Sequence, residues 1–195
     1  MLIVYLLLMG AESKGEVSIA GGMGFYTPDD FVFTAVGGDA ETSLSPVLLL
    51  ESGRVFKKYV GLGLGAGIIK TTVKGTIGKV EYLTLPLYGY AKAQLPLSGL
   101  LPYLRFDFGL PYFFTTWSPG IGTDQKEHLN GGGLCARIVA GVILGKGAVK
   151  LHLITGYTAY TFTLEVTYSG IINYTITQDA GLSGFEIMGG VTFTP

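Results

Sequence analysis

Apolar side chains recur at every second position over long stretches of this chain, and glycine fills many of the positions between them. In the segment YVGLGLGAGI (59–68), one face carries Val60, Leu62, Leu64, Ala66 and Ile68, and the other carries Gly61, Gly63, Gly65 and Gly67. Successive side chains of a β-strand point to opposite faces, so a period of two predicts strands. A strand with one apolar face and one nearly empty face suits the wall of a small closed barrel.

The same period predicts eight strands, and helical periodicity is absent after the first residues. The composition never shifts enough along the 195 residues to mark a second domain. The expected strands are 16–26, 45–56, 59–71, 80–95, 102–114, 134–144, 149–166 and 184–194.

The connections between these strands alternate between long and short. The long connections are 27–44, 72–79, 115–133 and 167–183, and the short ones are 57–58, 96–101 and 145–148. Up-and-down outer-membrane barrels have this arrangement, with an even strand number, short turns at one end and longer loops at the other. It also puts both chain ends on the short-turn side, whereas a soluble sandwich has no reason to separate its loops by length.

The charges within the strands predict which face meets lipid. In 102–114, Leu104 and Phe106 alternate with Arg105 and Asp107, and each charged residue is isolated while the apolar set is unbroken. We therefore expect the apolar faces outside and the charges inside, where they must nearly balance. The expected interior polar network comprises Glu51, Lys92, Arg105, Asp107, Arg137, Lys150, His152 and Glu186, with Arg105, Asp107, Arg137 and Glu186 at its centre.

Composition agrees with a membrane barrel. Apolar residues make up 48% of the chain and charged residues 14%, against about 25% charged residues in ordinary soluble domains. Mean hydropathy is +0.47, yet the chain lacks the uninterrupted run of about 18 apolar residues that a membrane helix requires. The 12 tyrosines and 11 phenylalanines are expected to include belts at the two membrane interfaces.

Charge and cysteine content exclude other classes. The net charge of -1, without a basic block, gives no support for nucleic-acid binding. One cysteine and two histidines predict neither an internal disulfide nor a structural zinc site, so we expect no metal and no cofactor.

The first residues predict a targeting segment. LIVYLLLM (2–9) followed by Gly10, Ala11 and Ser13 is typical of a signal-peptide core and cleavage site, although a positively charged start is missing. The expected division is a signal-peptide-like leader at 1–13 and a barrel at 14–195. A first strand or a membrane-anchor stub is the alternative.

The motifs of nearly the whole chain after the leader resemble the small eight-stranded outer-membrane barrels of the OmpA-like and OmpX-like group. The segments that carry the resemblance are VSIAGGMGFYTP, YVGLGLGAGI, LTLPLYGYAKAQLP, PYLRFDFGLPYFF and GFEIMGGVTFTP. It implies an all-β, eight-stranded antiparallel transmembrane barrel in the outer membrane of a two-membraned bacterium. Its implied partners are outer-membrane lipid and the barrel-assembly machinery. The chain departs from this group by ending Phe193-Thr194-Pro195 rather than on an aromatic residue.

Three functions follow as hypotheses. Eight strands leave an interior that side chains can fill, so a plugged, monomeric barrel with a structural or surface-interaction role is expected, with four external loops free to hold a ligand. A lipid-A-modifying enzyme is the first alternative. Its candidate residues are His152 with Thr155, Thr158 or Glu165, and His128 beside Glu127, but neither histidine has a serine at an obvious spacing. A soluble lipocalin-like carrier, with the apolar faces inside, is the second.

The acidic residues of loop 27–44 are the remaining candidate site. Asp29, Asp30, Asp39 and Glu41 offer carboxylate oxygens that suit calcium. They do not have EF-hand spacing, so a solvated acidic loop is the favoured interpretation.

Overall fold

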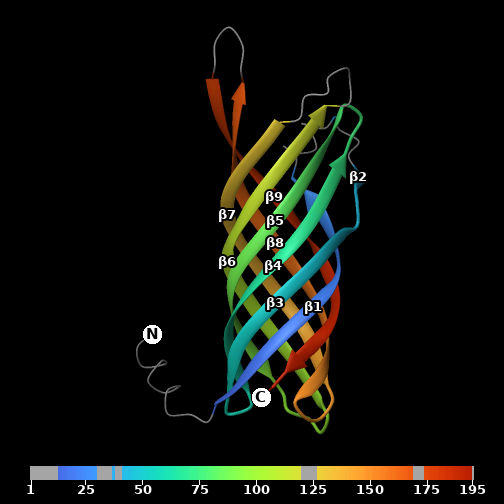
Figure 1. The fold of residues 1–195 in the computed structure, drawn as a ribbon, viewed down its shortest axis with the longest axis vertical. Coiled ribbons are helices and arrows are strands. Elements are labelled where there is room, and N and C mark those ends of the chain that lie inside the picture. The colour runs from blue at the N-terminus through green and yellow to red at the C-terminus, as the bar shows by residue number, and fades with distance from the viewer. Residues whose placement is uncertain (1–12, 30–36, 38–40, 120–126, 169–173, 195) are drawn as a thin grey trace, which may run out of the picture.

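The chain folds into a closed barrel of antiparallel strands (Figure 1). The computed structural model describes residues 13–29, 37, 41–119, 127–168 and 174–194. The predicted leader therefore lies outside the described residues, apart from Ser13, which begins the first strand. Among the described residues, no helix is long and apolar enough to cross a membrane.

Eight long strands and one two-residue strand form a single sheet. Each long strand pairs with its neighbours in sequence, and β1 pairs with β9, so the ring closes. The short β2 pairs with the upper end of β4. The strands are β1 (Ser13–Pro28), β2 (Glu41–Thr42), β3 (Ser45–Phe56), β4 (Val60–Lys74), β5 (Gly78–Gln94), β6 (Leu100–Pro119), β7 (Glu127–Leu144), β8 (Val149–Tyr168) and β9 (Tyr174–Phe193). The predicted fold class and strand number are confirmed.

The two ends of the barrel differ, as predicted. The turns after β3, β5 and β7 lie at the lower end, where β1 begins and β9 ends (Figure 1). At the upper end, the hairpin of β8 and β9 extends furthest above the rest of the barrel (Figure 1).

The prediction of long upper loops was wrong at three positions. β4 ends at Lys74 and β5 begins at Gly78, so the expected loop 72–79 has only three residues outside strands. Most of 115–133 and 167–183 also belongs to strands, because β6 and β7, and β8 and β9, continue upward past the apolar stretches.

One described contact on the exterior, near the start of the β8–β9 extension, is polar. Thr163 of β8 donates a hydrogen bond to Asp179 of β9 on the exposed face, with 3.0 Å between the oxygens. A backbone ladder needs no apolar side chain, so the strands persist where the alternation that predicts them has ended.

The barrel is apolar outside, and the charged residues of its strands point inward, as the sequence predicted. Leu104 and Ile138 are 65% and 63% exposed, whereas Arg105 and Arg137 are each 4% exposed. The same alternation runs along β1, β8 and β9, so the outer surface is a wall of leucine, isoleucine, valine and phenylalanine. Such a surface is stable against lipid, and the closed ladder leaves no edge in the hydrocarbon. The soluble-carrier alternative is excluded by this arrangement.

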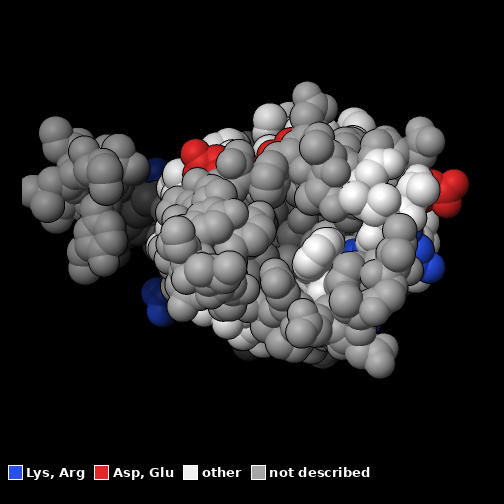
Figure 2. All heavy atoms as spheres, turned by 90° about the horizontal axis from the view of Figure 1, so that it is seen from above, with Lys and Arg blue, Asp and Glu red and all other residues white. Residues whose placement is uncertain are grey.

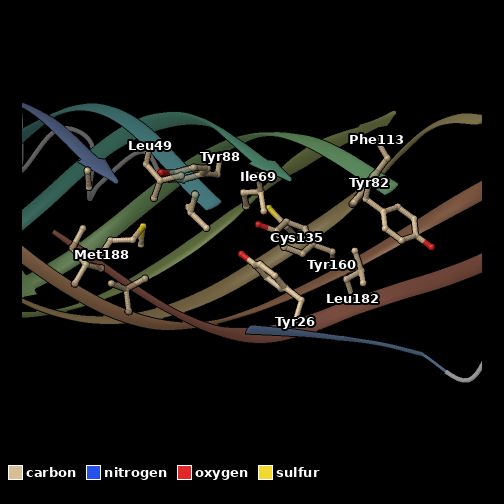
Figure 3. Close-up of a cluster of buried hydrophobic side chains, with 14 of the residues drawn as sticks. Tyr26, Leu49, Ile69, Tyr82, Tyr88, Phe113, Cys135, Tyr160, Leu182 and Met188 are labelled. Carbon is tan, nitrogen blue, oxygen red and sulfur yellow. The ribbon is translucent and has the colours of Figure 1, made fainter. Parts of the chain in front are cut away.

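The upper half of the interior is apolar, which the sequence analysis did not predict. Above the charged positions, the inward side chains include Leu49 of β3, Phe113 of β6, Tyr160 and Phe162 of β8, and Leu182 of β9 (Figure 3). The rings of Phe113 and Phe162 stack with centroids 4.0 Å apart. Alternation identifies the inward face but not its polarity, because a filled lumen can be packed with either kind of side chain.

Glycines on β4 make room for large side chains from β5. A Cβ atom added to Gly63 would meet the ring of Tyr90, and one added to Gly65 would meet the ring of Tyr88. The nearly empty face of β4 is therefore the surface on which two tyrosines lie. This contact turns both phenols toward the centre of the barrel.

Two prolines interrupt the ladder of the wall. Pro86 of β5 and Pro111 of β6 face each other in register. Each proline also adjoins a gap of two residue pairs in the ladder with the strand on its other side. Next to Pro111, the pairing of β6 with β7 is missing at Leu110 and Pro111, opposite Gly133 and Leu134. Proline has no N–H to donate, so a break beside it is expected.

The close contact between Gly65 and the Tyr88 ring predicts a stability difference between two alanine variants. In Gly65→Ala the added methyl group must displace the Tyr88 ring from its hydrogen bond with Glu51, so we expect a loss of about 2 kcal/mol. The matched control is Gly89→Ala, where the nearest atoms lie 3.9 Å from the new Cβ. Urea unfolding in detergent micelles measures both, and equal midpoints would contradict the packing role of Gly65.

Candidate functional site: the ionic network inside the barrel

Five charged side chains meet at the centre of the lumen. Arg105 contacts Glu51 at 2.7 Å and Asp107 at 2.8 Å. Arg137 contacts Asp107 at 2.9 Å, Glu186 at 3.3 Å and Glu51 at 3.7 Å. Each of these side chains is at most 4% exposed, so the two guanidinium groups offset two of the three carboxylate charges away from water.

This network crosses the whole barrel. Glu51 lies on β3 and Arg137 on β7, and these strands are four apart around the ring in either direction. Asp107 sits two residues from Arg105 on β6, so both point inward from the same face. The contacts therefore connect opposite walls and fill the lumen at this level.

Tyrosine and threonine hydroxyls complete the coordination of the carboxylates. Tyr88 donates to Glu51 at 2.7 Å, and Thr158 donates to Glu186 at 2.8 Å. Tyr26 also donates to Glu186. Charge-assisted hydrogen bonds of this kind offset part of the cost of taking a carboxylate out of water.

The guanidinium groups also lie against tyrosine rings. The Cζ atom of Arg105 is 4.9 Å from the Tyr90 ring centroid, and that of Arg137 is 5.2 Å from the Tyr88 centroid. Cation–π attraction to a desolvated arginine adds to the ion pairs. The glycines of β4 thus leave space for the two tyrosine rings, and these rings in turn contact the arginines.

A second polar group lies below the first. Lys92 of β5 pairs with Glu16 of β1 at 2.5 Å, and Tyr90 donates to Glu16 at 3.3 Å. His152 of β8 is hydrogen-bonded through Nε2 to the Tyr103 hydroxyl at 2.5 Å. These bonds link further strands across the lumen nearer the lower end.

The structure buries seven of the eight site residues that the sequence indicated. Lys150 is the exception: it lies half-buried at the lower mouth, where Nζ donates to Thr194 Oγ1 at 3.3 Å. Glu16 is a member that the sequence analysis missed. The signal was present, because Glu16 shares its face with Ser18 and Ala20 and alternates with Val17 and Ile19.

The environment of His152 does not form a nucleophile and base pair suited to lipid hydrolysis. Its Nδ1 lies 3.2 Å from Thr192 Oγ1, and Thr192 is bonded in turn to Ser18 at 2.9 Å. No carboxylate hydrogen-bonds to this imidazole among the described residues. Thr158, considered with His152 as a candidate, instead donates to Glu186.

Other candidates lie outside what the structure describes. The side chains of Glu127 and His128 are among these, as is most of the acidic loop, including Asp30 and Asp39. Within the described part of the chain, no three histidine, cysteine, aspartate or glutamate side chains are grouped to hold a metal ion. Cys135 is buried and free.

Comparison with known proteins supports the fold. No family model and no curated protein sequence matches the chain. Its structure is similar to the outer membrane protein OprG from Pseudomonas aeruginosa, with a TM-score of 0.52 and 15% identity over 95% of this chain and 98% of that one. It is also similar to the outer membrane protein AlkL, with a TM-score of 0.53 and 12% identity over 93% of this chain and 90% of that one.

The chain therefore has the fold of the small eight-stranded outer-membrane β-barrels. The resemblance that its sequence motifs indicated is confirmed at the level of the fold. Both neighbours are outer-membrane proteins, in agreement with the predicted location, and the apolar exterior described above is the surface that such a location requires.

The central network predicts a large effect for Arg137→Met. Removing this guanidinium leaves Asp107 and Glu186 buried with one ion-pair partner fewer, so we expect a loss of about 3 kcal/mol. Lys70→Met is the matched control, because Lys70 is exposed and pairs with Glu81 at 3.8 Å. A change of about 0.5 kcal/mol or less is expected there. Urea midpoints in micelles distinguish the two, and an unchanged Arg137→Met midpoint would rule out a stabilising network.

Proposed function

We propose that this protein is a plugged structural barrel of the outer membrane that presents its upper hairpins to partners outside the cell. The observation that carries the proposal is the contact between Arg137 and Glu51, which joins opposite walls of the lumen. Buried aromatic side chains above it and the Lys92–Glu16 pair below it leave no wide aqueous path through the described interior.

The β8–β9 hairpin is the proposed surface for partners. β7 and β8 are paired only up to Gly133 and Phe162, whereas β8 and β9 remain paired as far as Tyr168 and Tyr174. Among the described residues, the upper part of this hairpin thus has two strand edges without a neighbouring strand. Such edges can accept an added strand from another protein. Lipid, the assembly machinery and a monomeric state belong to the same proposal.

Electrical recording tests the plugged lumen. In planar bilayers we expect the parent protein to give no large, steady conductance, because the network and the aromatic layer fill the lumen. The double variant Glu51→Ser/Arg137→Ser removes one charge of each sign but leaves the aromatic layer and the Lys92–Glu16 pair in place, so we expect it also to give no large, steady conductance. An unboiled gel shift serves as the folding control for each sample. Steady porin-like current from the parent protein would contradict the proposal.

Lateral passage of a small apolar molecule is a second candidate function, favoured by the broken β6–β7 ladder. A depression of about 440 Å³ adjoins this break. Its lining is mixed, with apolar Leu134, Phe162 and Ala180, Gly133 and Gly181, and polar Asp29, Thr161, Thr163 and Asp179. Phe162 and Ala180 belong to the apolar upper interior, and Leu134 faces outward. A molecule that enters this layer from above would meet the ionic network below it and a weakened wall beside it.

Pro111→Ala tests the second candidate. The alanine supplies an N–H group that can complete the ladder toward β7, so uptake of a small apolar fluorophore by cells that carry the barrel should fall at least about two-fold. Pro46→Ala is the control, because Pro46 lies on the exposed face of β3, where pairing with β1 is continuous. Equal uptake in the two variants and the parent would exclude passage at this break.

A further inference from the structure

The lower mouth of the barrel contains a cavity that neither the central network nor the proposed function uses. Its volume is about 540 Å³, within the range of small-molecule sites. Strands from all sides of the ring contribute to it, together with the turn after β3. The lining residues are Lys14, Glu16, Val55, Lys57, Lys58, Tyr59, Gln94, Pro96, Leu101, Ile143, Lys150, Thr192 and Thr194.

The charge of this cavity is one-sided. Four lysines line it, at positions 14, 57, 58 and 150, and Glu16 is the one carboxylate in the lining. That carboxylate is already paired with Lys92 and accepts a hydrogen bond from Tyr90. The view from the opposite end shows both acidic and basic side chains at the edge of the molecule (Figure 2). The basic character of the lower mouth comes from the four lysines of its lining.

Two of these lysines occupy a turn that disfavours them. Lys57 and Lys58 have φ angles of 48° and 67°, left-handed values at the two central positions of a turn that the hydrogen bond from Tyr59 N–H to the Phe56 carbonyl closes. Asn-Gly is the favoured pair at such positions, and a residue with a Cβ costs about 1 kcal/mol there. The Gln94 amide donates to the Lys58 carbonyl at 3.1 Å and helps hold this turn in place. The backbone of this turn would favour Asn-Gly, so the presence of two lysines suggests that their positive charge has a function.

We propose that the lower mouth binds the phosphate group of an amphiphilic molecule. Lysine ammonium groups bind phosphate as point charges, and four of them surround the opening. Val55, Leu101 and Ile143 supply an apolar surface next to them for the uncharged part of the ligand. The short-turn end of such barrels faces the periplasm. The phosphate can therefore come from a phospholipid headgroup of the inner leaflet or from a free organophosphate.

This site is independent of the plugged lumen, because the Lys92–Glu16 pair and the Tyr103–His152 bond separate the two. A ligand at the lower mouth does not need to cross the barrel. The conductance experiment therefore tests the plugged lumen only, and the binding experiment below tests the phosphate site only.

The test uses Lys57→Asn/Lys58→Gly, which removes two charges and supplies the residues that the turn favours. Binding of glycerol 3-phosphate to the full chain in a neutral detergent is followed by amide NMR shifts of Lys57, Lys58 and Tyr59. A parallel series uses nanodiscs of phosphatidylcholine with and without phosphatidylglycerol. The matched control is Lys70→Gln/Lys79→Gln, which removes two charges at the upper end of β4 and β5.

We expect the turn variant to bind glycerol 3-phosphate or phosphatidylglycerol about ten-fold more weakly than the parent, while its urea midpoint stays equal or rises. The control variant should bind as the parent does. A response to phosphatidylglycerol alone assigns the phosphate to lipid, and a response to glycerol 3-phosphate assigns it to a free ligand. No shift with either probe, or equal loss in both variants, would overturn the proposal.

Discussion

Closure of the hydrogen-bonded ring is the constraint on which the rest of the structure depends. Lipid offers no hydrogen-bond partner to a backbone N–H or C=O group, so a sheet in the membrane must close into a barrel. The pairing of β1 with β9 satisfies this requirement, and it fixes the diameter of the lumen. Every inward side chain must then fit a space set by eight strands. The glycines of β4 and the tyrosines of β5 are one solution to that fit.

Closure of the ring also means that charged side chains inside the lumen are buried and need partners of opposite charge close by. Arg105 and Arg137 pair with three carboxylates, and Lys92 pairs with Glu16. Above this level the chain uses apolar packing instead, which needs no matching. The barrel thus keeps its buried charges in the lower part of the lumen and packs mainly aromatic and apolar side chains above them.

Much of this architecture could be predicted from alternation alone, and the reasons for the exceptions are physical. A period of two identifies Arg105 as inward and Leu104 as outward, because side-chain direction follows from the backbone. It cannot identify the partners: the contact of Arg137 with Glu51 depends on the register of strands far apart in sequence. It also ends at Phe114 of β6, whereas the backbone pairing of that strand continues to Pro119.

The contact across the lumen has a consequence for how the barrel assembles. β3 and β7 are brought within reach of each other only when the ring has closed, so their salt bridge cannot form in a half-inserted sheet. A slip of one residue in either strand would turn its charge toward hydrocarbon, at a cost of about 2 to 4 kcal/mol for an arginine near the midplane. The charged residues at the centre therefore make insertion of a strand in the wrong register energetically unfavourable.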